Sequence, residues 1–422
     1  MRFLSGVFTA VLAAVPGAVR AQENDRFSAD VVASAGYSNN PFTLVGDDTE
    51  SALVSVDLLP RYQRLTERSA LTLSGAASFQ RYLRRYSNNE SYSVAADYSL
   101  RASEQVTAHT RLDLVSAVIG ANNNFLPSIV GAGQAGPGIG AGTGASAGDI
   151  APGANATVVP LTPFTDIGLF GLRNRRRSAR LGGDTSIGMS AQDSLSVSGY
   201  GEIARYSRLP ELGDYEAYGA TLGYSRRLSE RLTAGLRGSV SNFNYKLDDS
   251  DSRVFSVEAT GSARLSEIWT ADGAVGVTFV DSGGVRSTRQ TSLSGSANLC
   301  RRGELSTLCI QGARQVTPTG LVGSQYVTTV GANWSRRLDE RENVSLNGNY
   351  SNVGSGDSRR LPGDLALQTE YAQAVAGYDR QINRRLRFVA SVNYRRLFGD
   401  NEGRPEDFGG QLGISYRIGD PQ

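Results

Sequence analysis

Most of the chain alternates between apolar residues and small or polar residues. In one such segment the apolar side is formed by Leu232, Ala234, Leu236, Gly238 and Val240, and the intervening residues are polar or glycine. The pattern recurs from Phe27 nearly to the end of the chain in segments of about ten residues. Successive side chains of a β-strand point to opposite faces, so a period of two predicts strands throughout the chain.

Short polar connectors separate pairs of these segments, and longer irregular stretches separate the pairs from one another. Short turns at one end and long loops at the other are typical of an outer-membrane barrel. Eight hairpins and one strand at each end predict an all-β, transmembrane, antiparallel up-and-down β-barrel of about 18 strands, with 16 and 20 as alternatives. The eight connectors are 64–68, 101–104, 191–193, 226–232, 264–267, 301–304, 336–341 and 381–384.

The first residues resemble an export signal. Arg2 precedes a mostly apolar run from Phe3 to Val15, and Val19-Arg20-Ala21 has the form of a cleavage site. The run is shorter than the ~20 residues of a membrane-spanning helix, which is the alternative interpretation. We therefore expect a signal peptide at 1–21 and a barrel at 22–422.

One insertion, residues 122–177, interrupts the alternation and falls on the extracellular side of the predicted topology. Its middle, Gly131 to Ala156, is mostly glycine and alanine and cannot bury enough apolar surface to order itself alone. It is either a surface loop or a segment that folds into the pore. A basic cluster at its end, Arg173, Arg175, Arg176 and Arg177, is predicted either to contact lipopolysaccharide phosphates at the outer rim or to be a solvated run of charges.

The polar faces of the predicted strands would line a wet lumen, which passes or holds polar solutes. Tyr200 and Phe243 also fall on inward faces, where they either stack on sugar rings or fill space. The predicted lining residues are Asp97, Arg101, His109, Arg111, Asp113, Arg180, Asp184, Tyr200, Glu202, Arg237, Glu258, Arg264, Arg387 and Arg395. Tyr98, Tyr224, Trp269 and Trp334 lie beside short turns, where an interfacial aromatic girdle would lie.

The composition offers little for catalysis. A serine hydrolase needs an imidazole, and His109 is the only histidine of the chain; its row with Arg111 and Asp113 is better explained as pore lining. We expect no enzyme activity, no metal and no cofactor. A formal net charge of +2 gives no argument for nucleic-acid binding.

The two cysteines flank one predicted short turn. Cys300 and Cys309 would lie opposite each other and point inward, and the oxidising periplasm favours a structural disulfide. A metal pair would need further ligands, which the sequence does not supply nearby.

Several motifs resemble a family of bacterial outer-membrane β-barrel porins, many of which are encoded near exopolysaccharide or capsule export genes. The resemblance rests on Ala35 to Phe42 after the first strand, Leu59 to Tyr62, Asp97 to Leu100 and the turn from Tyr378 to Leu386. It covers most of the mature chain with loose motifs. The glycine-rich insertion departs from the pattern.

The last strand resembles the signal that the barrel assembly machinery recognises. Gly413 is followed by the bulky Tyr416 and Ile418, although four residues, 419–422, come after them. The resemblance and the strand pattern together predict a porin-like channel for polar solutes in the outer membrane of a Gram-negative bacterium, as an accessory to exopolysaccharide export.

Two other functions stay open at this point. One is a plugged structural or adhesive barrel, and the less favoured one is an outer-membrane hydrolase. The expected partners are outer-membrane lipid and lipopolysaccharide, the barrel assembly machinery, and a polysaccharide or export apparatus, with no nucleic acid.

Overall fold

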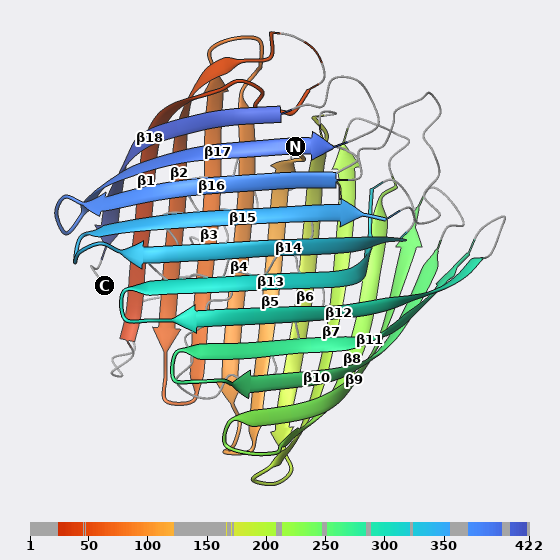
Figure 1. The fold of residues 1–422 in the computed structure, drawn as a ribbon. Coiled ribbons are helices and arrows are strands. Elements are labelled where there is room, and N and C mark those ends of the chain that lie inside the picture. Colours follow the sequence, from red (N-terminus) through yellow and green to blue (C-terminus); the bar gives the residue numbers. More distant parts are fainter. Residues whose placement is uncertain are drawn as a thin grey trace, which may run out of the picture.

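The computed structural model is one closed antiparallel barrel (Figure 1). It describes residues 24–44, 46, 48–121, 166, 170, 173–207, 213–246, 251–283, 288–320, 324–354, 370–398 and 406–419. The predicted signal peptide and the glycine-rich middle of the insertion lie outside these residues. In the described part of the chain, no helix is long and apolar enough to cross a bilayer.

Each strand pairs with the next one along the chain, and β1 pairs with β18 to close the ring. The predicted fold class and the predicted number of strands are both confirmed. The strands are β1 Asn24–Ser38, β2 Ser51–Leu65, β3 Ser69–Tyr82, β4 Asn89–Arg101, β5 Val106–Val118, β6 Arg175–Gly188, β7 Asp193–Ser207, β8 Tyr215–Arg227, β9 Leu232–Tyr245, β10 Ser252–Arg264, β11 Trp269–Ser282, β12 Thr288–Arg302, β13 Ser306–Pro318, β14 Ser324–Arg337, β15 Glu342–Val353, β16 Glu370–Gln381, β17 Leu386–Phe398 and β18 Glu406–Gly419.

The connections differ strongly between the two ends of the barrel. All eight connectors predicted to be short are turns of three or four residues, such as 66–68 and 228–231. The other end carries the longer connections, of which 119–174 between β5 and β6 is the longest. We call the first end periplasmic and the second extracellular, following the usual arrangement of such barrels.

The two faces of the wall differ as the alternation predicts. In β10, Phe255 and Val257 are exposed on the outside, whereas Ser256 and Glu258 are buried on the inside. Large apolar side chains continue around the outer surface, among them Leu236, Val275 and Leu293, each more than 60% exposed. An apolar outer belt on a closed barrel is suited to lipid, because closure leaves no unpaired edge in the hydrocarbon.

Strand tilt is visible in Figure 1, where β12–β17 cross in front of β2–β9. A barrel closes only when its strands tilt and their register staggers. A ring of this number of strands encloses a lumen wider than side chains alone fill. The side chains and connections inside that lumen therefore determine the function of the barrel.

Candidate functional site

The predicted lining residues occupy the inner faces of their strands. Arg101 and Arg264 lie at the last positions of β4 and β10 and are exposed at the periplasmic end. The others lie deeper and are engaged with one another or with neighbours that the sequence did not single out.

One charged group lies on β4, β5 and β6. Nε2 of His109 is 3.5 Å from Asp97, and Nδ1 is 3.3 Å from Asp184. Arg111 donates to Asp113 at 2.8 Å and lies 3.7 Å from Asp97. These side chains keep 11–41% of their surface exposed, so they form a hydrated wall of mixed charge.

The same wall continues on β6 and β7. Arg180 lies 3.6 Å from Glu202, and its guanidinium covers the ring of Tyr200 at 4.7 Å. The Tyr200 hydroxyl is 3.0 Å from Ser241 on β9. Arg180 thus covers one face of the Tyr200 ring, and Phe243 is buried in an apolar cluster, so Phe243 is not free to stack on a sugar in this conformation.

A second charged group spans β9, β10 and β12. Arg237 forms an ion pair with Glu258, and Ser294 donates to the same carboxylate at 3.1 Å. On the other side of the ring, Arg387 lies 3.9 Å from Asp379. The lining of the described strands therefore carries charges of both signs around the ring, with no continuous ladder of one charge among them.

Towards the extracellular end, Arg395 of β17 is held in a buried site. Its Nη2 donates to Asp407 at 2.8 Å and to the carbonyl of Pro41 at 3.1 Å, and its Nη1 donates to the carbonyl of Gly120 at 2.9 Å. Asp407 also accepts from Ser38, from the Asn40 amide and from Asn393. One buried ion pair thus fastens the β1–β2 connection and the start of the β5–β6 connection to β17 and β18.

Arg176 of β6 is the centre of a second buried site. It donates to Glu202 and to the Tyr215 hydroxyl, both at 2.8 Å, and lies 3.4 Å from Asp166 of the β5–β6 connection. Asp166 accepts from Tyr206 at 3.0 Å and from the amide of Gly320, beyond β13, at 2.9 Å. The connection therefore reaches across the lumen from β6 to the β13–β14 hairpin.

Aromatic contacts hold the rest of the described insertion inside the barrel. The ring of Phe170 packs edge-on against Tyr371 of β16, with the centroids 5.1 Å apart. Arg173 covers Phe42 at 4.6 Å and Tyr86 at 5.5 Å. Burial beside these groups raises the pKa of the Tyr86 phenol above its usual value.

These contacts concern only residues 166, 170 and 173–177 of the insertion, so the choice between a surface loop and a pore segment stays a prediction. Asp166 and Phe170 contact groups of the β13–β14 hairpin and of β16, whereas Arg173 packs on rings of the β1–β2 and β3–β4 connections. The basic cluster is correspondingly split, because Arg176 is turned into the lumen and Arg173 covers rings, while Arg177 is exposed. β6 begins at Arg175, so the connection ends at Asn174.

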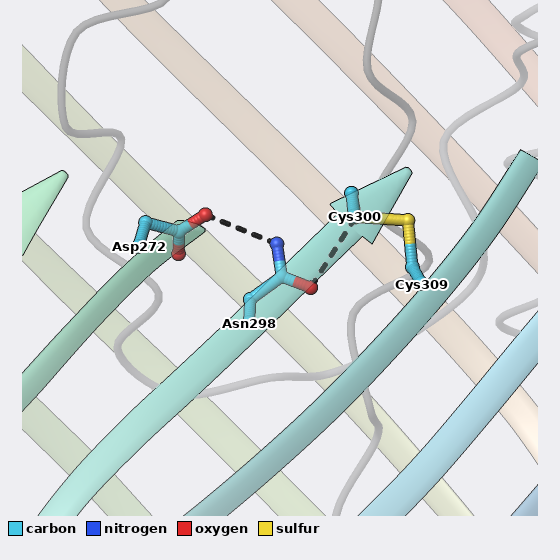
Figure 2. Close-up of a disulfide and its surroundings, with 4 residues drawn as sticks. All are labelled: Asp272, Asn298, Cys300 and Cys309. Atoms are coloured by element: carbon cyan, nitrogen blue, oxygen red, sulfur yellow. Dashed lines mark hydrogen bonds between the residues drawn. A yellow bond between two sulfur atoms is a disulfide. The ribbon is translucent and has the colours of Figure 1, made fainter. Parts of the chain in front are cut away.

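The two cysteines are directly opposite in the register of β12 and β13 and form a disulfide (Figure 2). Cys300 is fully buried and Cys309 is 4% exposed. Asn298 donates to Asp272 at 3.0 Å, and its carbonyl oxygen lies 3.5 Å from Cys300 Sγ, which carries no proton to donate. Among the described residues, no group of three or more His, Cys, Asp or Glu side chains is arranged to hold a metal.

The residues of the predicted assembly signal lie on β18. Tyr416 and Ile418 point outward and are 45% and 48% exposed. Gly413 lies against β1, where an added Cβ would be 2.8 Å from the carbonyl oxygen of Ala33. A side chain at that position would press on the seam that closes the barrel; the role in assembly stays a prediction.

Sequence reasoning missed part of this lumen. Asp407 could have been found, because the exposed Phe408 beside it places Asp407 on the inner face. Asp166 could not, since it lies in an irregular connection with no period to read. Arg176 falls in the predicted surface cluster because the sequence pattern places the end of the insertion at 177, whereas β6 begins at Arg175.

The outer belt, the closed ring and the charged lumen together decide the class of molecule. The chain is an outer-membrane β-barrel. Its location is therefore the outer membrane of a Gram-negative bacterium, where closed barrels with this division between faces occur.

Comparisons with known proteins add little beyond this. No family model matches the chain, and no curated protein matches it. Among solved structures it is similar to three Pseudomonas aeruginosa proteins: OccK11 (OpdR), with 11% identity and a TM-score of 0.43; OccK2 (OpdF) in complex with glucuronate, with 14% and 0.42; and OprD, with 10% and 0.40. The matches cover 94% of this chain and 96%, 98% and 95% of those chains. Likeness at this level carries no argument about function.

Proposed function

We propose that this barrel is a porin-like channel for small polar solutes, with an extracellular entrance narrowed by the β1–β2 and β5–β6 connections. The observation that carries the proposal is the partly exposed wall of mixed charge around His109 and Arg111, enclosed by a complete ring of strands. A lining that carries positive and negative side chains in contact with water suits polar solutes and does not require the solute to carry one particular charge.

An accessory role in exopolysaccharide export is the finer form of this proposal. It rests on the resemblance of segments such as Ala35 to Phe42, and the comparisons add no support to it. Tyr200, the candidate ring for stacking on a sugar, has one face covered by Arg180. A polysaccharide or an export apparatus as partner belongs to the same proposal, as do contacts with lipopolysaccharide and the barrel assembly machinery.

A plugged structural barrel is the second candidate, and one observation favours it. Arg395, Asp166 and Phe170 each connect segments from distant parts of the ring near the extracellular end. A hydrolase is less favoured, because both ring nitrogens of His109 face carboxylates and neither faces a serine hydroxyl among the contacts described.

Planar-bilayer conductance distinguishes the two candidates. The comparison is between the full barrel and a variant in which residues 122–174 are replaced by a short Gly-Ser linker, leaving β6 intact. Both must show the heat-dependent gel mobility of a folded barrel. A channel predicts conductance steps in the full barrel and larger steps in the variant.

Steps that occur only in the shortened variant would establish the plugged barrel instead. If the full barrel and the shortened variant both fold and neither conducts, the proposal of a channel is wrong.

A further inference from the structure

The chain has two tryptophans, and both lie on the outer face of the barrel near its periplasmic end. Trp269 is the first residue of β11 and shares the outward face with Val275, which is 64% exposed. Trp334 lies close to the end of β14, on the same face as Val330, which is 50% exposed. Tryptophan at this height is typical of the boundary between hydrocarbon and headgroups, because its ring is apolar and its N–H group is polar.

The register of the strands places an arginine between the two tryptophans. Arg301 of β12 is directly opposite Trp269 on one side and Leu308 of β13 on the other. Leu308 is in turn directly opposite Trp334. Directly opposite residues point to the same face of a sheet, so Arg301 points outward, as the buried, disulfide-bonded Cys300 before it also requires.

A second arginine lies on the same face, one row closer to the periplasmic turns. Arg336 follows Trp334 by two positions on β14 and is directly opposite Ser306 and Val344. Both arginines are exposed. We call this group the rim patch; it consists of Trp269, Arg301, Leu308, Trp334 and Arg336.

The two arginines of the rim patch have no carboxylate partner among the described residues. Other outward arginines at the same end of the barrel are paired, since Arg380 lies 3.3 Å from Glu342 and Arg226 lies 3.9 Å from Asp193. Glu267, in the turn before β11, forms no described ion pair with either arginine of the patch. The chain therefore leaves the positive charge of the rim patch without a partner of opposite sign in the part that the structure describes.

We propose that the rim patch binds an anionic phospholipid of the periplasmic leaflet. The lipid phosphate would accept hydrogen bonds from the guanidinium groups of Arg301 and Arg336, whose planar donors match phosphate geometry. The acyl chains would lie along the apolar outer face next to the patch, where Ile310 and Val330 are 49% and 50% exposed. A zwitterionic headgroup brings its own cation, so two arginines favour a headgroup of net negative charge. The inference goes beyond the proposed channel, because it rests on the position of the barrel in the membrane and not on conductance.

The two tryptophans are themselves the probe for this site, because the chain has no other tryptophan. The full barrel is reconstituted in phosphatidylcholine vesicles that contain rising fractions of brominated phosphatidylglycerol or, in parallel, of brominated phosphatidylcholine. Bromine in the acyl chains quenches tryptophan fluorescence only at short range, so the quenching reports which lipid lies against the rim patch. An arginine near an anionic lipid gives about a fivefold preference, so two of them predict enrichment of phosphatidylglycerol on the order of tenfold or more.

Arg301→Gln and Arg336→Gln should each lower that preference about fivefold, and the double variant should bring it close to one. Replacing both arginines by lysine keeps the charge and should keep most of the preference, since lysine also binds phosphate. Arg226→Gln is the matched control for the single variants, because it removes an outward arginine at the same end of the barrel that already has a carboxylate partner. It should leave the preference unchanged.

All variants must show the heat-dependent gel mobility of a folded barrel, which we expect because the substituted side chains are exposed. Equal quenching by the two brominated lipids in the unmodified barrel would overturn the proposal and would favour a periplasmic protein with an acidic surface as the occupant. A loss of preference in Arg226→Gln as large as that in Arg301→Gln would also overturn it, because general attraction by the basic rim would then explain the enrichment.

Discussion

The ion pairs at the two depths of the lumen differ in what surrounds them. Arg395 and Asp407, near the extracellular end, are 3% and 0% exposed and hold backbone carbonyls of two connections. His109, nearer the periplasmic end, is 41% exposed and faces carboxylates on its own wall. A cation beside a carboxylate therefore fixes loops at one depth and presents charge to water at the other. Burial decides which role a charged pair has.

The largest effect is expected from Arg395→Leu. It leaves the Asp407 carboxylate buried without its cation, which should lower the free energy of unfolding by about 3–5 kcal/mol. Urea unfolding in detergent measures the change. Replacing Asp407 by leucine as well should recover most of it, because no unpaired charge then stays buried. A loss below about 1 kcal/mol for the single variant would show that the pair is hydrated.

Arg176→Leu should have a smaller effect of about 2–3 kcal/mol. Glu202 keeps a second cation, Arg180 at 3.6 Å, and the Tyr215 hydroxyl at 3.0 Å, so it is not stranded. Asp166 loses its cation, however, and its hold on Gly320 should weaken. The same unfolding assay, with wider conductance steps as a second readout, checks this variant. An effect as large as that of Arg395→Leu would contradict the ranking.

Asp184→Asn should change stability least, by less than about 1 kcal/mol, because its partner His109 is 41% exposed and screened by water. It should change ion selectivity instead. Removing a negative charge from the lumen wall should move the reversal potential in a salt gradient towards that of the anion. Glu216→Gln is the control, since Glu216 is exposed on the outer face. If the reversal potential shifts equally in both variants, His109 and its partners do not lie on the conduction path.

The alternation of residues was enough to predict most of this architecture. In β9 and β10 it separates Leu236 and Phe255 outside from Arg237 and Glu258 inside, and that separation follows from strand geometry alone. It carries no information on how connections fold back over the lumen. Phe170 and Tyr371 meet although nothing in their local sequences indicates it.

The inward turn of the β13–β14 hairpin was unpredictable for a related reason. Val316 and Tyr326 fit the outward pattern of a simple strand, and only tertiary packing turns them onto the inner cluster. A period of two predicts on which face of a strand each side chain lies, but it does not predict how the strand curves. Strand alternation therefore fails to predict two places in this barrel: the extracellular entrance and the extracellular half of the β13–β14 hairpin, where pairing with β12 ends at Gly295↔Arg314.

The burial of the disulfide sets an order for the maturation of the protein. Thiol oxidation proceeds through attack on an accessible sulfur. Cys300 and Cys309 are enclosed once the ring is complete, yet they are separated by only nine positions and flank a single turn. We therefore expect their oxidation to occur before the barrel closes around them, since the short turn between them brings the two thiols together. The disulfide thus bears on the order of assembly as well as on the stability of the folded barrel.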